Sequence, residues 1–128
     1  MHSRDAAKDT LDMLKATNAG DVGGVIHCFS YGTEMAREFL NMGFFIGLDG
    51  PVTFKNGKKA KEIAAYVPGD RLVIETDCPY MAPDPVRGSR NSSLNLKYIA
   101  DEIARIRGMS VDETRTMLYD NAMKLYNL

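Results

Sequence analysis

Two histidines and one aspartate are the residues whose types and spacing best suit metal chemistry in this sequence. His2 and His27 are 25 residues apart, about the length of one strand-plus-helix unit, and Asp77 follows His27 after 50 residues, about two such units. His27 and Asp77 each stand near the end of an apolar run, and His2 precedes a helical pattern in the same way. Two imidazoles and a carboxylate at equivalent strand ends would suit Zn²⁺, Mn²⁺ or Mg²⁺. Such a cation acidifies a bound water and polarises a phosphoryl oxygen.

Each of these residues also has a structural interpretation. A single histidine at a strand end is more often a satisfied polar residue than a ligand, and Asp77 could cap the turn that follows its strand. His2 could be an exposed residue at a frayed terminus. The metal-site hypothesis therefore depends on the three residues lying together.

Two further acidic residues lie near these strand ends. Glu75 precedes Asp77 by two positions, so both side chains are expected on the same strand face, where Glu75 could orient a metal ligand by a hydrogen bond. A purely structural hydrogen bond is the alternative. Asp49, in the run GLDG, ends the expected middle strand and could be a further ligand, although a turn aspartate before Gly50 is the favoured interpretation.

The loop after Asp77 contains a group that could bind phosphate. Arg87, Arg90 and Asn91 lie in the segment RGSRN, and arginine suits phosphate through paired hydrogen bonds. A solvated basic loop is the alternative for these residues.

Apolar runs alternate with amphipathic helical patterns along the chain, which predicts an α/β fold with a parallel sheet covered by helices. Three strands are too few to close a barrel, so the chain is either a small open sheet or part of a larger (β/α)8 barrel. The stretch 1–3 reads as the end of a further strand, which favours the second interpretation. The expected strands are 23–29, 44–48 and 72–77; the expected helices are 5–18, 33–42, 58–67, one through 96–106 and one beginning at the capping box of Ser110 and Glu113.

Composition is that of an ordinary globular domain. The 128 residues are 45% hydrophobic and 26% charged, with a formal net charge of −1, so any nucleic-acid contact must be local rather than a bulk electrostatic effect. Cys28 and Cys78 are too few for a disulfide framework and are expected to be reduced. No apolar run approaches the length of a membrane span, and the cytoplasm is the expected location.

Several segments, in order along the whole chain, resemble the TatD family of metal-dependent deoxyribonucleases. The opening HSRDA is similar to that family's His-x-Arg-x-Ala segment, and the most specific matches contain the HCFS and ETDxPY motifs. The matching segments are GVIHCFS (24–30), PVTFKNGKK (51–59), ETDCPYMAP (75–83), RGSRN (87–91) and DNAMKLYNL (120–128).

The resemblance implies that residues 1–128 are the C-terminal half of a (β/α)8 barrel hydrolase of the amidohydrolase-like superfamily. Such an enzyme would cleave phosphodiester bonds of DNA, or sometimes RNA, from 3′ to 5′ with divalent metal ions. By matching motifs, His2, His27 and Asp77 correspond to metal ligands, and Asp77 also to the general base that activates water.

The family's His-x-His pair and its bridging glutamate are not in this sequence, so the site would have only three of its protein ligands. A half barrel also leaves the edge strand 23–29, and the apolar faces meant for missing strands, open to water. This predicts a homo-oligomer, pairing with a separate N-terminal half, or marginal stability. Two alternatives stay open: a metal-dependent amidohydrolase or esterase acting on a small molecule, and a non-catalytic remnant.

Overall fold

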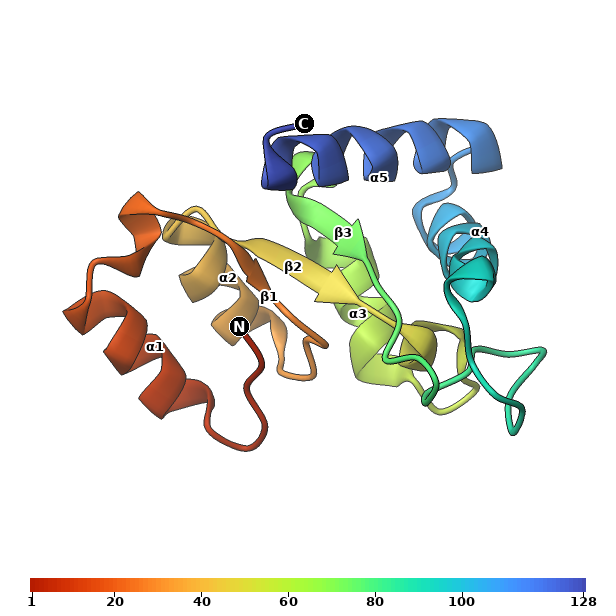
Figure 1. Ribbon diagram of the computed structural model, residues 1–128, viewed down its shortest axis with the longest axis horizontal. Coiled ribbons are helices and arrows are strands. Elements are labelled where there is room, and N and C mark those ends of the chain that lie inside the picture. The colour runs from red at the N-terminus through yellow and green to blue at the C-terminus, as the bar shows by residue number, and fades with distance from the viewer.

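The protein, whose 128 residues are all described by a computed structural model, is built on one three-stranded parallel sheet (Figure 1). Its strands are β1 (Val25–Ile26), β2 (Phe45–Leu48) and β3 (Leu72–Ile74), and they lie side by side in the order β1-β2-β3. Ile46 of β2 pairs with Ile26 of β1 and with Leu72 of β3. The predicted α/β architecture with about three parallel strands is confirmed.

Five α-helices connect and follow the strands, close to the expected positions. Asparagine or glycine in the left-handed region ends α4 and α5, at Gly108 and Asn127, and the predicted capping box of Ser110 and Glu113 begins α5. No helix combines the length and the apolar character that crossing a bilayer requires. The helices are α1 (Ala7–Ala16), α2 (Thr33–Asn41), α3 (Lys58–Tyr66), α4 (Leu96–Arg107) and α5 (Val111–Tyr126).

The strands are shorter than the apolar runs that contain them. The run 23–29 was expected to be a strand throughout, but Gly23 and Gly24 have φ of 73° and 140°, and Cys28 has φ of 50°. These positive values turn the chain away from an extended path before and after β1. The third strand ends at Ile74 rather than Asp77, although Glu75 still donates its N–H to the Leu48 carbonyl.

The first residues extend the sheet beyond β1. His2 forms an isolated parallel bridge with His27, while the backbone N–H of His27 donates to the Met1 carbonyl at 2.8 Å and the terminal amine of Met1 donates to the Val25 carbonyl at 2.9 Å. The prediction that this stretch behaves as the end of a strand is confirmed.

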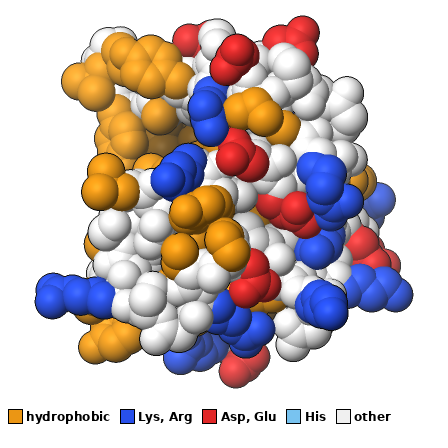
Figure 2. Space-filling model, turned by 90° about the vertical axis from the view of Figure 1, so that its right-hand side faces the viewer, with side chains coloured by type: hydrophobic (Ala, Val, Ile, Leu, Met, Phe, Trp, Pro, Cys, Tyr) orange, Lys and Arg blue, Asp and Glu red, His pale blue; other side chains and the backbone are white.

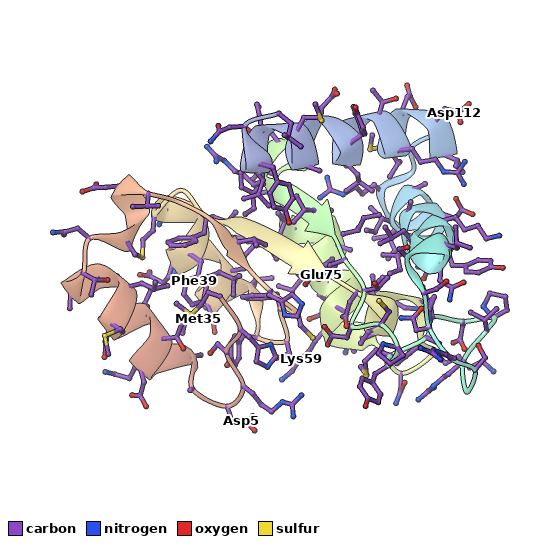
Figure 3. All side chains as sticks on the ribbon, viewed as in Figure 1. Asp5, Met35, Phe39, Lys59, Glu75 and Asp112 are labelled. Carbon is purple, nitrogen blue, oxygen red and sulfur yellow. The ribbon has the colours of Figure 1, made fainter.

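The core lies between the sheet and its helices. Ile46 and Leu72 from the strands, Phe39 from α2 and Ile103 from α4 are fully buried in one continuous cluster. Figure 3 labels Phe39 on α2, which with α3 lies behind the sheet in Figure 1. Burying each such side chain contributes about 1.5–3 kcal/mol, so this layer fixes the strand ends on which the site depends.

The outer side of β3 is only partly covered. A shallow cavity of about 380 Å³ opens there, with Ile74 and Leu118 in its mostly apolar wall. Figure 2 shows hydrophobic side chains gathered at the upper left of the neighbouring face, whereas acidic and basic side chains are intermixed over its right and lower parts. The open strand edge was expected at 23–29, but His2 pairs with His27 beside β1, and the exposed apolar surface lies instead at β3, the other border of the sheet.

Candidate metal centre

The carboxyl ends of the three strands bring the chemically active side chains together. His27 directly follows β1, Asp49 directly follows β2, and Glu75 directly follows β3, with Asp77 two residues later. The strands are parallel and in register, so these positions share one edge of the sheet. Figure 3 shows the labelled Glu75 beside the ends of β2 and β3.

His27 lies between His2 and Asp77. Its Nδ1 is 3.3 Å from Nδ1 of His2, and its Nε2 is 3.1 Å from Oδ1 of Asp77. The three residues predicted as metal ligands therefore lie in one contiguous row at the mouth of the site. His2 and Asp77 contact opposite nitrogens of the His27 ring, so the three residues can bind one metal ion only if a ring rotates.

Glu75 contacts His27 and the backbone of Cys28. Its Oε2 is 3.4 Å from Nε2 of His27, and its Oε1 accepts a hydrogen bond from the backbone N–H of Cys28. The carboxylate passes over β2 at Gly47, where an added Cβ would lie 2.6 Å from Oε1 of Glu75. A glycine inside a strand commonly marks such a close approach, and this is the sequence signal for the contact.

Cys28 and Asp49 extend the polar cluster beyond the predicted residues. The Cys28 thiol donates to Oδ2 of Asp49 at 3.5 Å, and the ligand atoms of Cys28, Asp49 and Asp77 all lie within 4.8 Å of one another. Partial burial, and then the negative charge of Asp49 and Asp77, raises the pKa of Cys28 to about 12, so the free side chain is a thiol. Asp49 stands at the start of the turn Gly50–Thr53, as the favoured interpretation expected, and its side chain also belongs to this cluster.

The carboxylates of the cluster have no lysine or arginine partner. Glu75 and Asp77 form ion pairs only with His27, and Asp49 forms none. Burial raises the pKa of both Asp49 and Glu75, because removing a carboxylate from water disfavours its charged form. Imidazole and carboxylate groups that lack a basic counterpart fit a divalent cation, which would supply the missing positive charge.

The three predicted phosphate-binding residues in the loop after Asp77 differ in exposure and in contacts. The Arg87 guanidinium lies over the Phe54 ring, 4.1 Å from its centroid, and Arg90 is exposed. The side chain of Asn91 is instead buried: it donates to the Tyr80 carbonyl at 2.7 Å and accepts from the Ser92 N–H at 2.9 Å. Asn91 thus holds the loop together, and its contacts do not support the predicted role in binding substrate.

A hollow of about 450 Å³ opens beside Asp77. Arg4 and Tyr80, which were not among the predicted site residues, line it together with Cys28 and Asp77. Tyr80 is 75% exposed and is therefore available to contact a ligand from solvent. Both residues lie in segments that resemble the family, HSRDA and ETDxPY, and that resemblance is the sequence signal that could have identified them.

Comparisons with known proteins agree with this arrangement. The family model described as TatD related DNase matches residues 1–127. The chain is 44% identical over its full length to YabD of Bacillus subtilis (strain 168), which is named an uncharacterized metal-dependent hydrolase, and covers 50% of that protein. It is 32% identical to a protein of Rahnella sp. (strain Y9602) named 3′-5′ ssDNA/RNA exonuclease TatD and covers 51% of it.

A solved structure shows the same fold. The crystal structure of YJJV, a TatD homolog from Escherichia coli K12, matches 99% of this chain and 49% of its own chain, with a TM-score of 0.89 at 28% identity. The three parallel strands and their helices are thus part of a TIM-type (β/α)8 barrel, and the chain spans about half the length of the relatives it matches. From the match over residues 1–127, we conclude that the chain belongs to the TatD-related DNase family.

Proposed function

We propose that this protein is the metal-binding part of a hydrolase that cleaves phosphodiester bonds of DNA or RNA from the 3′ end. The single observation that carries the proposal is the position of His27, which contacts His2 on one side and Asp77 on the other at the carboxyl edge of a parallel sheet. A relative named as an ssDNA/RNA exonuclease supports nucleic acid as the substrate class.

Each residue of the cluster has a distinct part in this proposal. His2, His27 and Asp77 hold a divalent cation, Zn²⁺, Mn²⁺ or Mg²⁺, which when bound would make a water more acidic and a phosphoryl oxygen more electrophilic. Asp77, with 29% of its side chain exposed, accepts the proton of the attacking water at a carboxylate oxygen. Glu75 acts through His27 by fixing the orientation of its ring.

The substrate side of the proposal rests on the loop and the hollow beside Asp77. Arg87 is held over Phe54 with its guanidinium facing solvent, and Arg4 lines the hollow, so both can bind phosphate oxygens. Tyr80 offers an exposed ring on which a base can stack, an interaction worth about 1–3 kcal/mol. Arg90, which is exposed in the same loop, is a further phosphate contact.

The 128 residues supply only part of this proposed centre. The chain spans about half the length of its matched relatives, and we propose that the remaining metal ligands come from polypeptide outside these residues, either an N-terminal half or a second copy. We further propose a cytoplasmic location, because both cysteines are free and a reducing compartment keeps them so.

The test is a metal-dependent assay of the 128-residue chain. Release of nucleotides from 3′-labelled single-stranded DNA is measured with Zn²⁺, Mn²⁺ or Mg²⁺, for the natural chain and for His27→Ala and Asp77→Asn. We expect each variant to lose activity by about 10²- to 10⁴-fold, the contribution of a positioned acid or base. Asp21→Asn, an exposed aspartate remote from the cluster, is the matched control and should keep full activity.

Three results would contradict the proposal. Equal activity in Asp77→Asn and the natural chain would exclude the assigned site. Faster cleavage of a nitrophenyl ester than of a nitrophenyl phosphodiester would favour an esterase or amidohydrolase instead. Tight metal binding without any hydrolysis, even after addition of an N-terminal half, would favour a non-catalytic protein.

A further inference from the structure

A group of three side chains beside the histidine row has the composition of a separate metal site. The Sγ of Cys28 and one carboxylate oxygen each of Asp49 and Asp77 lie within 4.8 Å of one another, and the three residues follow three different strands. We propose that they bind a second, thiophilic divalent cation such as Zn²⁺ or Cd²⁺. This inference goes beyond the proposed hydrolase and rests on it only where Asp77 is shared.

The spacing of the three atoms suits a single ion. Zinc lies about 2.3 Å from a cysteine sulfur and about 2.0–2.2 Å from a carboxylate oxygen, so ligands of one tetrahedral ion are about 3.6 Å apart. Atoms that are at most 4.8 Å apart need to approach by about 1 Å to reach that geometry. Small rotations of the Cys28 and Asp77 side chains, which are both partly exposed, can provide that movement.

The burial of Asp49 without a basic partner also favours a cation at this position. The residue is only 4% exposed, yet it takes part in no ion pair, and the Cys28 thiol is the only side chain that donates to it. A buried carboxylate is normally neutralised by a basic group or a metal ion, because its desolvation is otherwise uncompensated. Its Oδ2 accepts from the Cys28 thiol, so this carboxylate, which has no basic partner, is directed into the cluster.

Sulfur sets the metal preference of this site. Thiolate ligands favour Zn²⁺ and other soft cations, whereas carboxylate oxygens alone favour Mg²⁺ or Mn²⁺. On binding, the Cys28 thiol loses its proton to solvent and the sulfur forms the metal bond, so no oxidant or reductant is needed. Cys28 can reach the mouth because its φ of 50° redirects the chain after His27, and Glu75 holds its backbone N–H.

Cadmium and cobalt titrations of the full chain test the proposal directly. Binding at this site should produce an ultraviolet thiolate-to-metal charge-transfer band with Cd²⁺ or Co²⁺. We expect Cys28→Ser to abolish the band and Asp49→Asn to weaken Cd²⁺ binding by at least about tenfold. Cys78→Ser is the matched control, because Cys78 is the other free cysteine and lines the same hollow, and it should retain the band.

A histidine variant separates this site from the proposed catalytic centre. His2→Ala removes a ligand of the histidine row but none of the sulfur site, so it should keep the band while losing DNA hydrolysis. Loss of the band in His2→Ala would show one shared site and overturn the proposal, as would a band that survives in Cys28→Ser. A band without hydrolysis, even after addition of an N-terminal half, refutes only the proposed function, whereas hydrolysis without a band refutes only this inference. Circular dichroism of each variant verifies folding.

Discussion

Polar side chains at the two ends of the sheet have different partners: backbone groups at the amino end, and one another at the carboxyl end. At the amino end, Asn121 of α5 donates to the carbonyls of Gly69 and Leu72 at 2.6 and 2.7 Å, and Arg107 of α4 donates to the Val67 carbonyl. There side chains satisfy backbone groups, and Arg107 Nε is the one buried side-chain atom without a partner. At the carboxyl end, Asp77 contacts His27 and lies close to Cys28 and Asp49, and no lysine or arginine pairs with the carboxylates.

This difference separates residues that hold the fold from residues that are available for chemistry. A side chain that is fully bonded to the backbone contributes to stability and has nothing left to offer a ligand. Groups that repel or only weakly bond one another lower stability but gain when a cation arrives, and the carboxyl edge of parallel strands is where barrel enzymes place them. Changes at the amino end should therefore alter stability and leave metal binding unchanged, whereas changes at the carboxyl end should have their main effect on metal binding.

The largest change in stability is expected for Asn121→Ala. The substitution leaves the two carbonyls of Gly69 and Leu72 without their donor, and each unsatisfied buried group costs about 1–3 kcal/mol. We expect the free energy of unfolding in urea to fall by about 2–4 kcal/mol while the affinity for Zn²⁺ stays unchanged. Asn41→Ala, at an exposed position, is the control. A loss of Zn²⁺ affinity in Asn121→Ala would show that the amino end of the sheet also affects metal binding.

Gly47→Ala is the converse change, at the carboxyl end. The new Cβ would lie 2.6 Å from Oε1 of Glu75, so the carboxylate must leave its place beneath His27. We expect Zn²⁺ affinity, measured by calorimetry, to fall by about 10- to 100-fold, as when the support of a metal ligand is lost. Gly32→Ala has open space around its Cβ and should bind normally. Unchanged affinity in Gly47→Ala would show that the position of Glu75 does not matter.

A smaller effect is expected at the start of α5. Ser110→Ala removes the side chain that accepts from the Glu113 N–H, and loss of such a cap costs about 1 kcal/mol. The expected result is a lower urea midpoint and an unaltered metal affinity. Ser30→Ala, at an exposed loop position, provides the reference. Equal midpoints for the two variants would mean that the capping box contributes nothing measurable.

The smallest expected effect is a pH-dependent change in stability at a carboxylate that has basic partners. Glu102, unlike the carboxylates of the metal centre, has basic partners: hydrogen bonding to Arg105 and then to Lys61 lowers its pKa below the ordinary 4.5. A carboxylate with a lowered pKa stabilises the fold above its unfolded pKa, and this contribution is lost as pH falls below about 4.5. Glu102→Gln should remove under about 1 kcal/mol of that acid-dependent stability, measured by urea unfolding from pH 6 to 3. An equal loss in Glu62→Gln, which forms no ion pair, would contradict the assignment.

Much of the fold follows from local sequence patterns. Apolar runs and helical periodicity identified the strands and helices, and glycine or proline marked where most of them end. His27 and Asp77 were recognisable because each follows an apolar run, and parallel strands bring such positions to one edge. These inferences need only neighbours in the sequence and one rule of topology.

Contacts between residues far apart in the chain could not be predicted from local sequence patterns. Glu75 bonds the N–H of Cys28, 47 positions away, and Asn121 bonds Leu72 across 49. The shared site of Cys28 and Asp49 depends on a positive φ that a cysteine rarely adopts, so no local pattern announces it. Asn91 was misjudged for a related reason: a polar residue in a loop reads as exposed until the loop's own fold is known.

The unpaired outer border of β3 makes thermal behaviour depend on protein concentration. Backbone groups and apolar side chains on that border can be covered by another polypeptide, and a partner that binds only the folded state raises its population by mass action. We therefore expect the melting temperature to increase as the sample is concentrated, with light scattering reporting a growing mass. A melting temperature that is constant on dilution, for a single-chain mass, would show that the border is stable uncovered.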